Sequence, residues 1–380
     1  MNTADVILEL AHGAGFDLAG LAPLAPPPDG ERFEAWLDAG HGADMDWLEK
    51  NRARIRDPRG LSEGSATLLV VGMGHSRPPV ELPGGGRVAR YAAGRDYHNR
   101  LGKGLKRLGK ALNREGLLDP GRAGRAMTDA APLLERSHAE VAGLGFASKA
   151  GNLLNPAHGP WFFLGELLLE VPFEQLDWVP SPPPGSCGTC TACIDACPTQ
   201  AIVAPGQVDA RLCISYQTIE NRGPVPNDLR PKLSGWAFGC DVCSEVCPWG
   251  SKAPDRSADW GRHEGLELDL VGILGQEPGT FSEVWRGSPL QRPKRDGLAR
   301  NAALALAAVP SERGRLALTE AARGDASPMV REAAAWALAE AHGDEPGTRA
   351  ILDATLAGLP EGPLGALLRE TRDRLDGPTS

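Results

Sequence analysis

The segment CGTCTACIDACP, residues 187–198, contains four of the eight cysteines in this 380-residue chain. Their spacing, C-x2-C-x2-C-x3-C-P, is the run with which bacterial ferredoxins bind [4Fe-4S] clusters. A second segment, CDVCSEVCP at residues 240–248, repeats this spacing without its first cysteine, and Cys213 is the obvious replacement. All the cysteines fall within residues 187–247, and eight thiolates are what two clusters require.

In such a run, three cysteines bind one cube and the fourth binds the other cube. We therefore predict a crossed assignment, in which the first cluster is held by Cys187, Cys190, Cys193 and Cys247, and the second by Cys197, Cys213, Cys240 and Cys243. A structural zinc site needs four ligands and does not explain the third cysteine of each run or the C-P endings. Disulfides are not expected, because the N-terminus has no apolar signal region and a cytoplasmic chain is kept reduced.

Composition limits the other possibilities. No uninterrupted apolar run reaches the roughly eighteen residues of a membrane span, so we expect a soluble, cytoplasmic protein without a membrane partner. The net charge of -9 means that any RNA site must be a local basic patch. Residues 101–114 predict an amphipathic helix whose basic face is either simply solvated or a phosphate-binding surface. That face comprises Lys103, Lys106, Arg107, Lys110 and Arg114.

Hydrophobic patterning predicts alternating helices and strands before the cysteines and helices after them. Helices are expected at residues 3–12, through residues 33–37, and from about residue 43 through residue 48. Core strands are expected at 67–73 and 160–171. Residues 177–186 form a proline-rich linker. The alanine-rich segment at 300–307 is echoed 31 residues later, which suggests a short helical repeat of the HEAT type. We expect three domains, at 1–176, 177–255 and 256–380.

Two features outside the cysteines have an open interpretation. The basic stretch at 50–59, which includes Arg52, is either a solvated helix end or a site for an anionic ligand. Asp129 lies in a loop before a predicted helix, where an acidic residue is usually only a cap. Spacing alone therefore gives Asp129 little claim to catalysis.

Several motifs in linked order resemble the epoxyqueuosine reductase family, and the similarity extends over nearly the whole chain. They are MDWL at 45–48, IRDPR at 55–59, GRDYH at 94–98, DAAPLLER at 129–136, PWFFLGE at 160–166 and the cysteine block. Ala130 replaces the Thr or Ser that the family often has, and Ser148 replaces the glycine of a Gly-Lys pair. Both differences leave the charged groups in place.

The resemblance implies an α+β protein in three parts. These are an α/β cobalamin-binding domain similar to that of reductive dehalogenases, a ferredoxin-like domain with two [4Fe-4S] clusters, and a HEAT-like helical domain. It also implies two-electron reduction of epoxyqueuosine to queuosine at the wobble position of tRNAs with a GUN anticodon (Asn, Asp, His, Tyr). Flavodoxin or ferredoxin is the expected type of low-potential electron donor, and a monomer is expected.

The resemblance also assigns roles to individual residues. Asp129 is the expected proton donor, which requires a buried carboxyl that is protonated near neutral pH. Cobalamin contacts are expected from Arg52, Tyr91, Asp129, Arg136, Lys149, Leu153 and Ser215. The cobalamin signature D-x-H-x2-G is absent, because Gly102 follows Asp96-Tyr97-His98 one residue too late, so no histidine ligand to cobalt is expected.

Binding of tRNA is expected from helix 103–114, from the helical repeat, and from Arg292, Lys294, Arg295 and Arg300. Two other functions are compatible with parts of the sequence. One is a dehalogenase-like cobalamin reductase of a small molecule, and the other is a non-enzymatic two-cluster electron carrier. The carrier would need only the cysteine block and would leave some 300 residues unexplained.

Overall fold

The computed structural model describes residues 2–118, 125–129, 131–181 and 183–375. The chain divides into two units, each made of three segments. The first unit comprises Met1–Arg77, Asp96–Ala210 and Val242–Trp260; the second comprises Pro78–Arg95, Arg211–Asp241 and Gly261–Ser380. The predicted boundaries of three consecutive domains stay a prediction.

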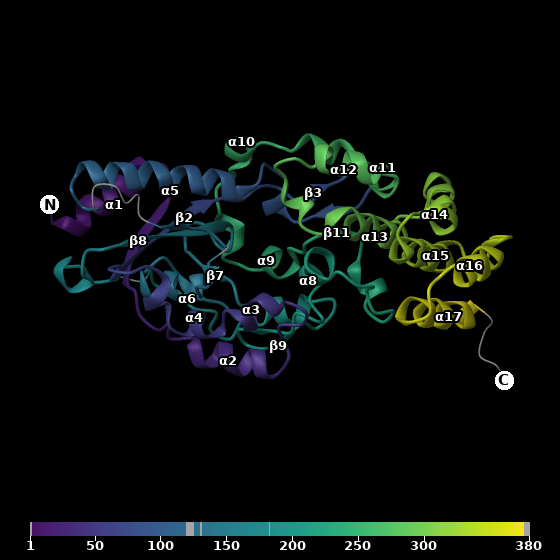
Figure 1. The fold of residues 1–380 in the computed structure, drawn as a ribbon, viewed down its shortest axis with the longest axis horizontal. Coiled ribbons are helices and arrows are strands. Elements are labelled where there is room, and N and C mark those ends of the chain that lie inside the picture. Colours follow the sequence, from purple (N-terminus) through teal and green to yellow (C-terminus); the bar gives the residue numbers. More distant parts are fainter. Residues whose placement is uncertain (1, 119–124, 130, 182, 376–380) are drawn as a thin grey trace. The chain divides into compact units, whose positions relative to one another are not determined.

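The first unit is built on a four-stranded sheet with the order β1-β2-β8-β5 (Figure 1). The strands are β1 (Leu18–Pro23), β2 (Thr67–Gly74), β5 (Ala126–Met127) and β8 (Phe162–Leu169). The two core strands predicted from apolar runs are thus confirmed. Every pairing in this sheet is antiparallel, which corrects the expected α/β arrangement to α+β. The apolar run in β2 reflects burial of both faces, not parallel pairing.

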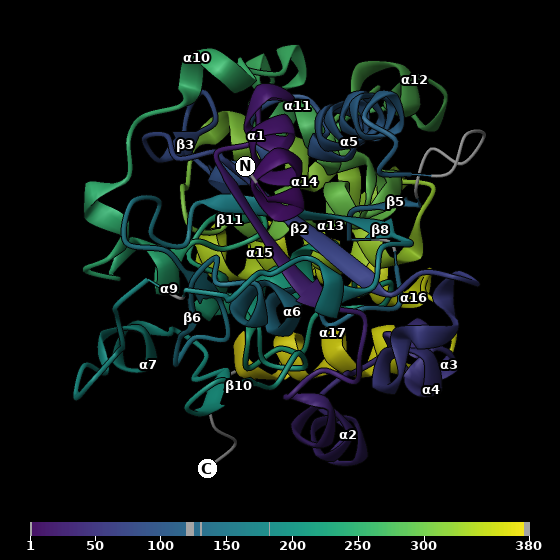
Figure 2. The same ribbon diagram turned by 90° about the vertical axis from the view of Figure 1, so that its left-hand side faces the viewer.

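Helices cover both faces of this sheet (Figure 2). α1 (Thr3–Gly13) and α5 (Tyr97–Arg114) pack on one face, where Leu101, Leu105, Leu108 and Leu112 are fully buried. α6 (Glu135–Val141) packs on the other face with a second apolar cluster. The leucine face of α5 is buried and the five basic residues of the predicted face are exposed, so the predicted amphipathic helix is confirmed.

The remaining elements of the first unit are short. Between β1 and β2 lie three helices, α2 (Gly30–Asp38), α3 (Asp46–Lys50) and α4 (Arg52–Arg56). Around the cysteines lie β6 (Phe146–Ala147), β7 (Leu153–Leu154), α7 (Ala192–Ala196), β9 (Ile202–Ala204), β10 (Gln207–Val208), α9 (Val242–Glu245) and α10 (Ser257–Trp260).

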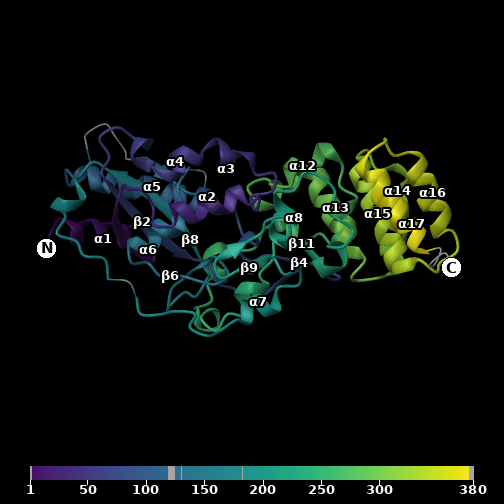
Figure 3. The same ribbon diagram turned by 90° about the horizontal axis from the view of Figure 1, so that it is seen from below.

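The second unit joins a small sheet to helices. Its sheet has the order β11-β4-β3, formed by β3 (Val80–Glu81), β4 (Arg87–Val88) and β11 (Trp236–Phe238). Its helices are α8 (Ile214–Ile219), α11 (Leu270–Leu274), α12 (Pro278–Val284), α13 (Lys294–Leu306), α14 (Glu312–Gly324), α15 (Pro328–His342), α16 (Thr348–Ala357) and α17 (Pro363–Leu375). Helices α14–α17 pack side by side (Figure 3). The two alanine-rich echoes lie on α13 and α15, and their assignment to the HEAT class stays a prediction.

Buried charge ties the helices of the second unit to the segment before β11. Arg230 binds Glu332 of α15 through two 2.8 Å hydrogen bonds, with both side chains 1% exposed. Arg300 of α13 donates to the carbonyl oxygens of Gln217 and Asn221. Because Arg300 is 1% exposed, the expectation that it contacts tRNA is wrong in this structure. No helix in the described part of the chain is long and apolar enough to cross a membrane.

The Arg230–Glu332 pair predicts an asymmetric response to substitution. Burial raises the pKa of Glu332 despite the neighbouring Arg230. Desolvation of the two charges therefore offsets much of the attraction between them. We expect Arg230→Met to lower the free energy of unfolding by about 3–5 kcal/mol, because it leaves a buried carboxylate without a partner. The double variant Arg230→Met/Glu332→Leu should recover most of that loss in urea unfolding. Arg372→Met, which breaks a more exposed ion pair with Asp373, should change stability by less than about 1 kcal/mol. Equal losses in all three variants would contradict the argument.

Candidate active site and cluster cavity

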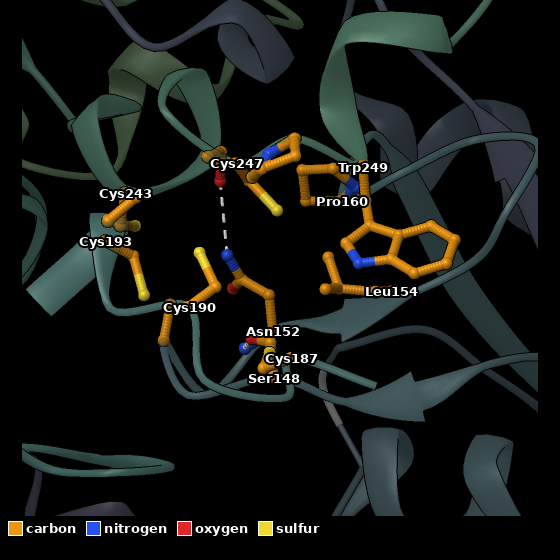
Figure 4. A pocket seen from close by; sticks show the side chains of 14 residues that line it. Ser148, Asn152, Leu154, Pro160, Cys187, Cys190, Cys193, Cys243, Cys247 and Trp249 are labelled. Carbon is orange, nitrogen blue, oxygen red and sulfur yellow. Dashed lines mark hydrogen bonds between the residues drawn. The ribbon is translucent and has the colours of Figure 1, made fainter. Parts of the chain in front are cut away.

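Five cysteines of the first unit line one cavity of about 470 Å³, including space open to solvent (Figure 4). They are Cys187, Cys190, Cys193, Cys243 and Cys247. The four ligands predicted for the first cluster are all among them. Within the described residues, no three His, Cys, Asp or Glu side chains converge on a single metal ion. Thiols spaced around a cavity suit a cube of iron and sulfur better than one zinc ion.

The chemistry of these thiols also fits an iron–sulfur cluster. Burial raises the pKa of the Cys193 and Cys247 thiols, and nearby cysteine thiols raise both further. Binding as thiolates therefore needs a positive partner, which iron supplies. Trp249 and Leu154 form an apolar wall beside the thiols (Figure 4).

A tight turn at residues 148–152 supports one side of the cavity. The Ser148 hydroxyl accepts a hydrogen bond from the Asn152 backbone at 3.0 Å, and Gly151 at the turn has a φ of +80°. The Asn152 amide donates to the Ser244 hydroxyl at 3.1 Å, across the cavity. Lys149 donates to the carbonyl oxygens of Gly188 and Cys190 at 2.8 and 3.0 Å. Lys149 thus fixes the backbone of the first cysteine loop.

Asp129 lies at the end of the sheet, after β5. Its Oδ2 accepts a hydrogen bond from the Tyr97 hydroxyl at 2.5 Å and lies 3.8 Å from His98 Nε2. A hydrogen bond from His98 to Asp96 raises the pKa of His98. The Asp129 side chain is 62% exposed, so the expected burial of this carboxyl is not provided by the described residues. Tyr97, His98 and Asp129 form a group of ionisable side chains in which Tyr97 is half-buried and the other two are exposed.

Helix α6 connects this group to the cavity. It begins six residues after Asp129, and the Arg136 guanidinium donates to the Gly151 carbonyl oxygen at 2.7 Å. The same turn therefore contacts Arg136 from one direction and the cysteine loop from the other. Asp129 and the cysteine-lined cavity thus lie in one unit, and separate hydrogen bonds of Glu135, Arg136 and Lys149 support the segments that carry them.

The sequence patterns did not predict a role for two acidic residues that interact with Asp129, namely Glu135 and Glu166. Glu135 Oε1 accepts a hydrogen bond from the Asp129 backbone at 2.6 Å. Glu166, in the middle of β8, is completely buried. Glu166 belongs to the PWFFLGE motif and to a predicted core strand, and a lone carboxyl inside the apolar run FFLGELLL is the sequence signal that could have distinguished it.

The other predicted cofactor contacts lie in varied settings. Arg52 forms ion pairs with Asp38 and Glu49 on the helical face formed by α2–α4. Leu153 is 5% exposed and packs in the core beside α6. Tyr91 and Ser215 belong to the second unit, as do the predicted cluster ligands Cys213 and Cys240. The role of each as a ligand stays a prediction.

Comparison with known proteins agrees with this site. Residues 186–250 match a family described as "4Fe-4S double cluster binding domain", and residues 55–130 match "Epoxyqueuosine reductase QueG, DUF1730". An epoxyqueuosine reductase of Xanthomonas campestris is 37% identical over 353 residues, which cover 90% of this chain and 97% of the relative. This chain belongs to the epoxyqueuosine reductase family. The expected two-cluster iron–sulfur domain is confirmed.

Solved epoxyqueuosine reductases share the fold. One, in complex with an epoxyqueuosine-modified tRNA-Tyr stem loop, is 25% identical with a TM-score of 0.82, over 98% of both chains. Another, from Bacillus subtilis, is 25% identical with a TM-score of 0.80, over 97% of this chain and 98% of that one. It is described with its catalytic aspartate loop swung out of the active site.

The contacts of Lys149 generate a test of the cysteine loop. Lys149→Met removes a cation that donates to two carbonyl oxygens, and bonds of this kind contribute about 1.5–3 kcal/mol. We expect the variant to lose iron several-fold faster than the unaltered protein when a chelator is added anaerobically. Lys252→Met, an exposed lysine beyond the last cysteine, is the control and should behave normally. Iron loss at the unaltered rate in Lys149→Met would show that the loop does not depend on these bonds.

Proposed function

We propose that this protein reduces epoxyqueuosine to queuosine in tRNA, with Asp129 as the proton donor and two [4Fe-4S] clusters as the electron path. The observation that supports this most is the connection described above. An exposed carboxyl with two neighbouring proton carriers lies in the same unit as a cavity of five thiols. The reduction consumes two electrons and two protons and releases one water, so it needs both parts.

Asp129 is suited to deliver a proton to the oxygen of an opening epoxide. The Tyr97 hydroxyl orients its Oδ2, and His98 stands next to it with a raised pKa that favours the protonated imidazole. His98 can therefore replace the proton that Asp129 gives away, which serves a reaction that consumes two. Asp96 holds His98 in this place through a 2.7 Å contact with Nδ1.

Cobalamin is part of the proposal, and the exposed groups beside Asp129 fit it. A corrin ring carries amide groups around its edge, and the exposed side chains of Asp129 and Arg136 offer an acceptor and a donor to such groups. Lys149 is a further proposed contact. Tyr91, Ser215, Arg52 and Leu153 complete the proposed contacts. When bound, cobalamin would supply the reducing electrons to the epoxide. The residues of this chain would orient the base and donate protons.

The proposed cluster ligands are those of the crossed assignment. Cys187, Cys190, Cys193 and Cys247 would bind the first cluster, and Cys197, Cys213, Cys240 and Cys243 the second. A flavodoxin- or ferredoxin-type protein would supply low-potential electrons, and we propose that the enzyme acts as a cytoplasmic monomer on tRNAs with a GUN anticodon.

The function is tested by single-turnover reduction of epoxyqueuosine tRNA with reconstituted protein that holds about eight irons and one cobalt. Asp129→Asn should lower the rate roughly 10²–10⁴-fold, because it removes a general acid. Asp177→Asn is a matched control, since Asp177 is also exposed and also has a positive φ, of 45°. A full rate in Asp129→Asn with iron and cobalt intact would remove Asp129 from the mechanism.

Binding of tRNA is proposed to use the exposed basic face of α5, together with Arg292 and Lys294 of the second unit. Arg292 forms an exposed ion pair with Glu220, and Arg295 is mostly buried against Asp325, so Lys294 is the better contact of the neighbouring pair. Phosphate groups are the same at every nucleotide, so contacts from α5 to the tRNA backbone should contribute affinity and not sequence selectivity.

The salt dependence of tRNA binding tests the α5 surface. Replacing Lys103, Lys106 and Lys110 with alanine removes three cations, so the log–log slope of affinity against salt should become shallower by about 2–3. Lys252→Ala is the control and should leave the slope unchanged. An unchanged slope in the triple variant would show that α5 does not contact the phosphates.

A further inference from the structure

Glu166 occupies a position where an ionised carboxylate is strongly disfavoured. It lies in β8, opposite Val70 of β2 and Met127 of β5, and between Leu164 and Leu168 along its own strand. The side chain is 0% exposed. No donor among the described residues reaches either of its carboxyl oxygens. A buried carboxylate without donors is costly enough that the group takes up a proton instead.

The neighbour that can accept this proton in a hydrogen bond is Glu135. Glu135 lies on α6, which packs against β8, and its carboxyl interacts with that of Glu166. Two carboxyl groups can form a hydrogen bond only if one of them carries a proton. Burial raises the pKa of Glu166 well above its usual range, and burial together with the charge of Asp129 raises the pKa of Glu135 to about 7.

The remaining charged groups around the pair are few. From α6, Arg136 favours the ionised form of Glu135, and His138 is neutral because burial lowers its pKa to about 4. From α5, His98 lies close enough to interact with both Asp129 and Glu135, and Tyr97 bonds to Asp129. β2 and β5 present apolar residues opposite Glu166. One proton shared by two carboxyls leaves a single negative charge beside Arg136.

The pair also determines the backbone at Asp129. Glu135 Oε1 accepts the Asp129 N–H at 2.6 Å, and Asp129 has a φ of +55°, which side-chain-bearing residues adopt only when their surroundings hold them there. We propose that Glu135 and Glu166 share one proton and that this acid pair is the positioning element that holds Asp129 in place for proton transfer. The positioning role rests on the function proposed above, whereas the shared proton does not.

The proposal predicts a pH dependence of defined direction. Carboxyls whose pKa is raised in the folded protein stabilise it at low pH, and this contribution is lost as pH rises through the raised value. When the pair loses its proton, two buried carboxylates repel each other and Glu135 can no longer stay under Asp129. Single-turnover rate should therefore fall at alkaline pH, where the pair loses its shared proton. Glu166→Gln keeps a neutral donor to Glu135 at every pH, so its alkaline decline should move to higher pH by about one unit or more, with tRNA affinity unchanged.

The shared proton is measured directly by infrared spectroscopy on cluster-loaded protein without cobalamin. The unaltered protein should show the carbonyl band of a protonated carboxyl near neutral pH. Glu166→Gln should abolish it, and Glu135→Gln should shift its frequency, because the second variant removes the carboxylate that accepts the shared proton. Glu140→Gln is the matched control on the same helix, where Glu140 accepts the Ala147 N–H, and it should keep the band.

Absence of this band in the unaltered protein, or its survival in Glu166→Gln, would overturn the shared proton. A band that behaves as expected, with an unshifted alkaline limb in Glu166→Gln, would overturn the positioning role. Failure of the unaltered protein to reduce epoxyqueuosine tRNA would instead count against the proposed function and leave the infrared result standing.

Discussion

The hydrogen bonds of the 148–152 turn are the constraint on which the site depends. Arg136 reaches the turn from α6, and Lys149 extends from it to the cysteine loop. The left-handed φ of Gly151 lets the chain reverse tightly enough to present the Gly151 carbonyl to Arg136. In the proposed function, the proton donor needs exchange with water whereas the clusters need protected thiols. The short polar turn contacts both α6, which follows Asp129, and the first cysteine loop.

Much of this arrangement could be predicted from local patterns. Cysteine spacing is imposed by the shape of a cube, so the cluster-binding segment is readable without structure. The helical period of α5 and the apolar runs of β2 and β8 are equally direct, because burial follows from the spacing of leucines and valines. These features depend on residues close together in the chain.

The features that could not be predicted depend on contacts between distant residues. Arg300 was expected at a surface because arginine usually is, yet carbonyl groups near residue 220 surround it. The interaction of Glu166 with Glu135 was not predicted, because the neighbours of Glu166 in the sequence are apolar and Glu135 is 31 residues away. The antiparallel sheet was missed because unbroken apolar strands occur wherever helices cover both faces. Lys149 was expected at a cofactor, but its observed partners are backbone carbonyl groups of the cysteine loop.

The exposure of the Asp129 side chain has a consequence for the order of events. A donor in contact with bulk water exchanges its proton freely and gains nothing from a low-dielectric surrounding. If Asp129 is the acid, as proposed, a bound molecule that covers it would shield a carboxyl that the described residues of this chain leave open to water. Proton delivery would then depend on occupancy of the site, which would limit the consumption of electrons by an empty enzyme.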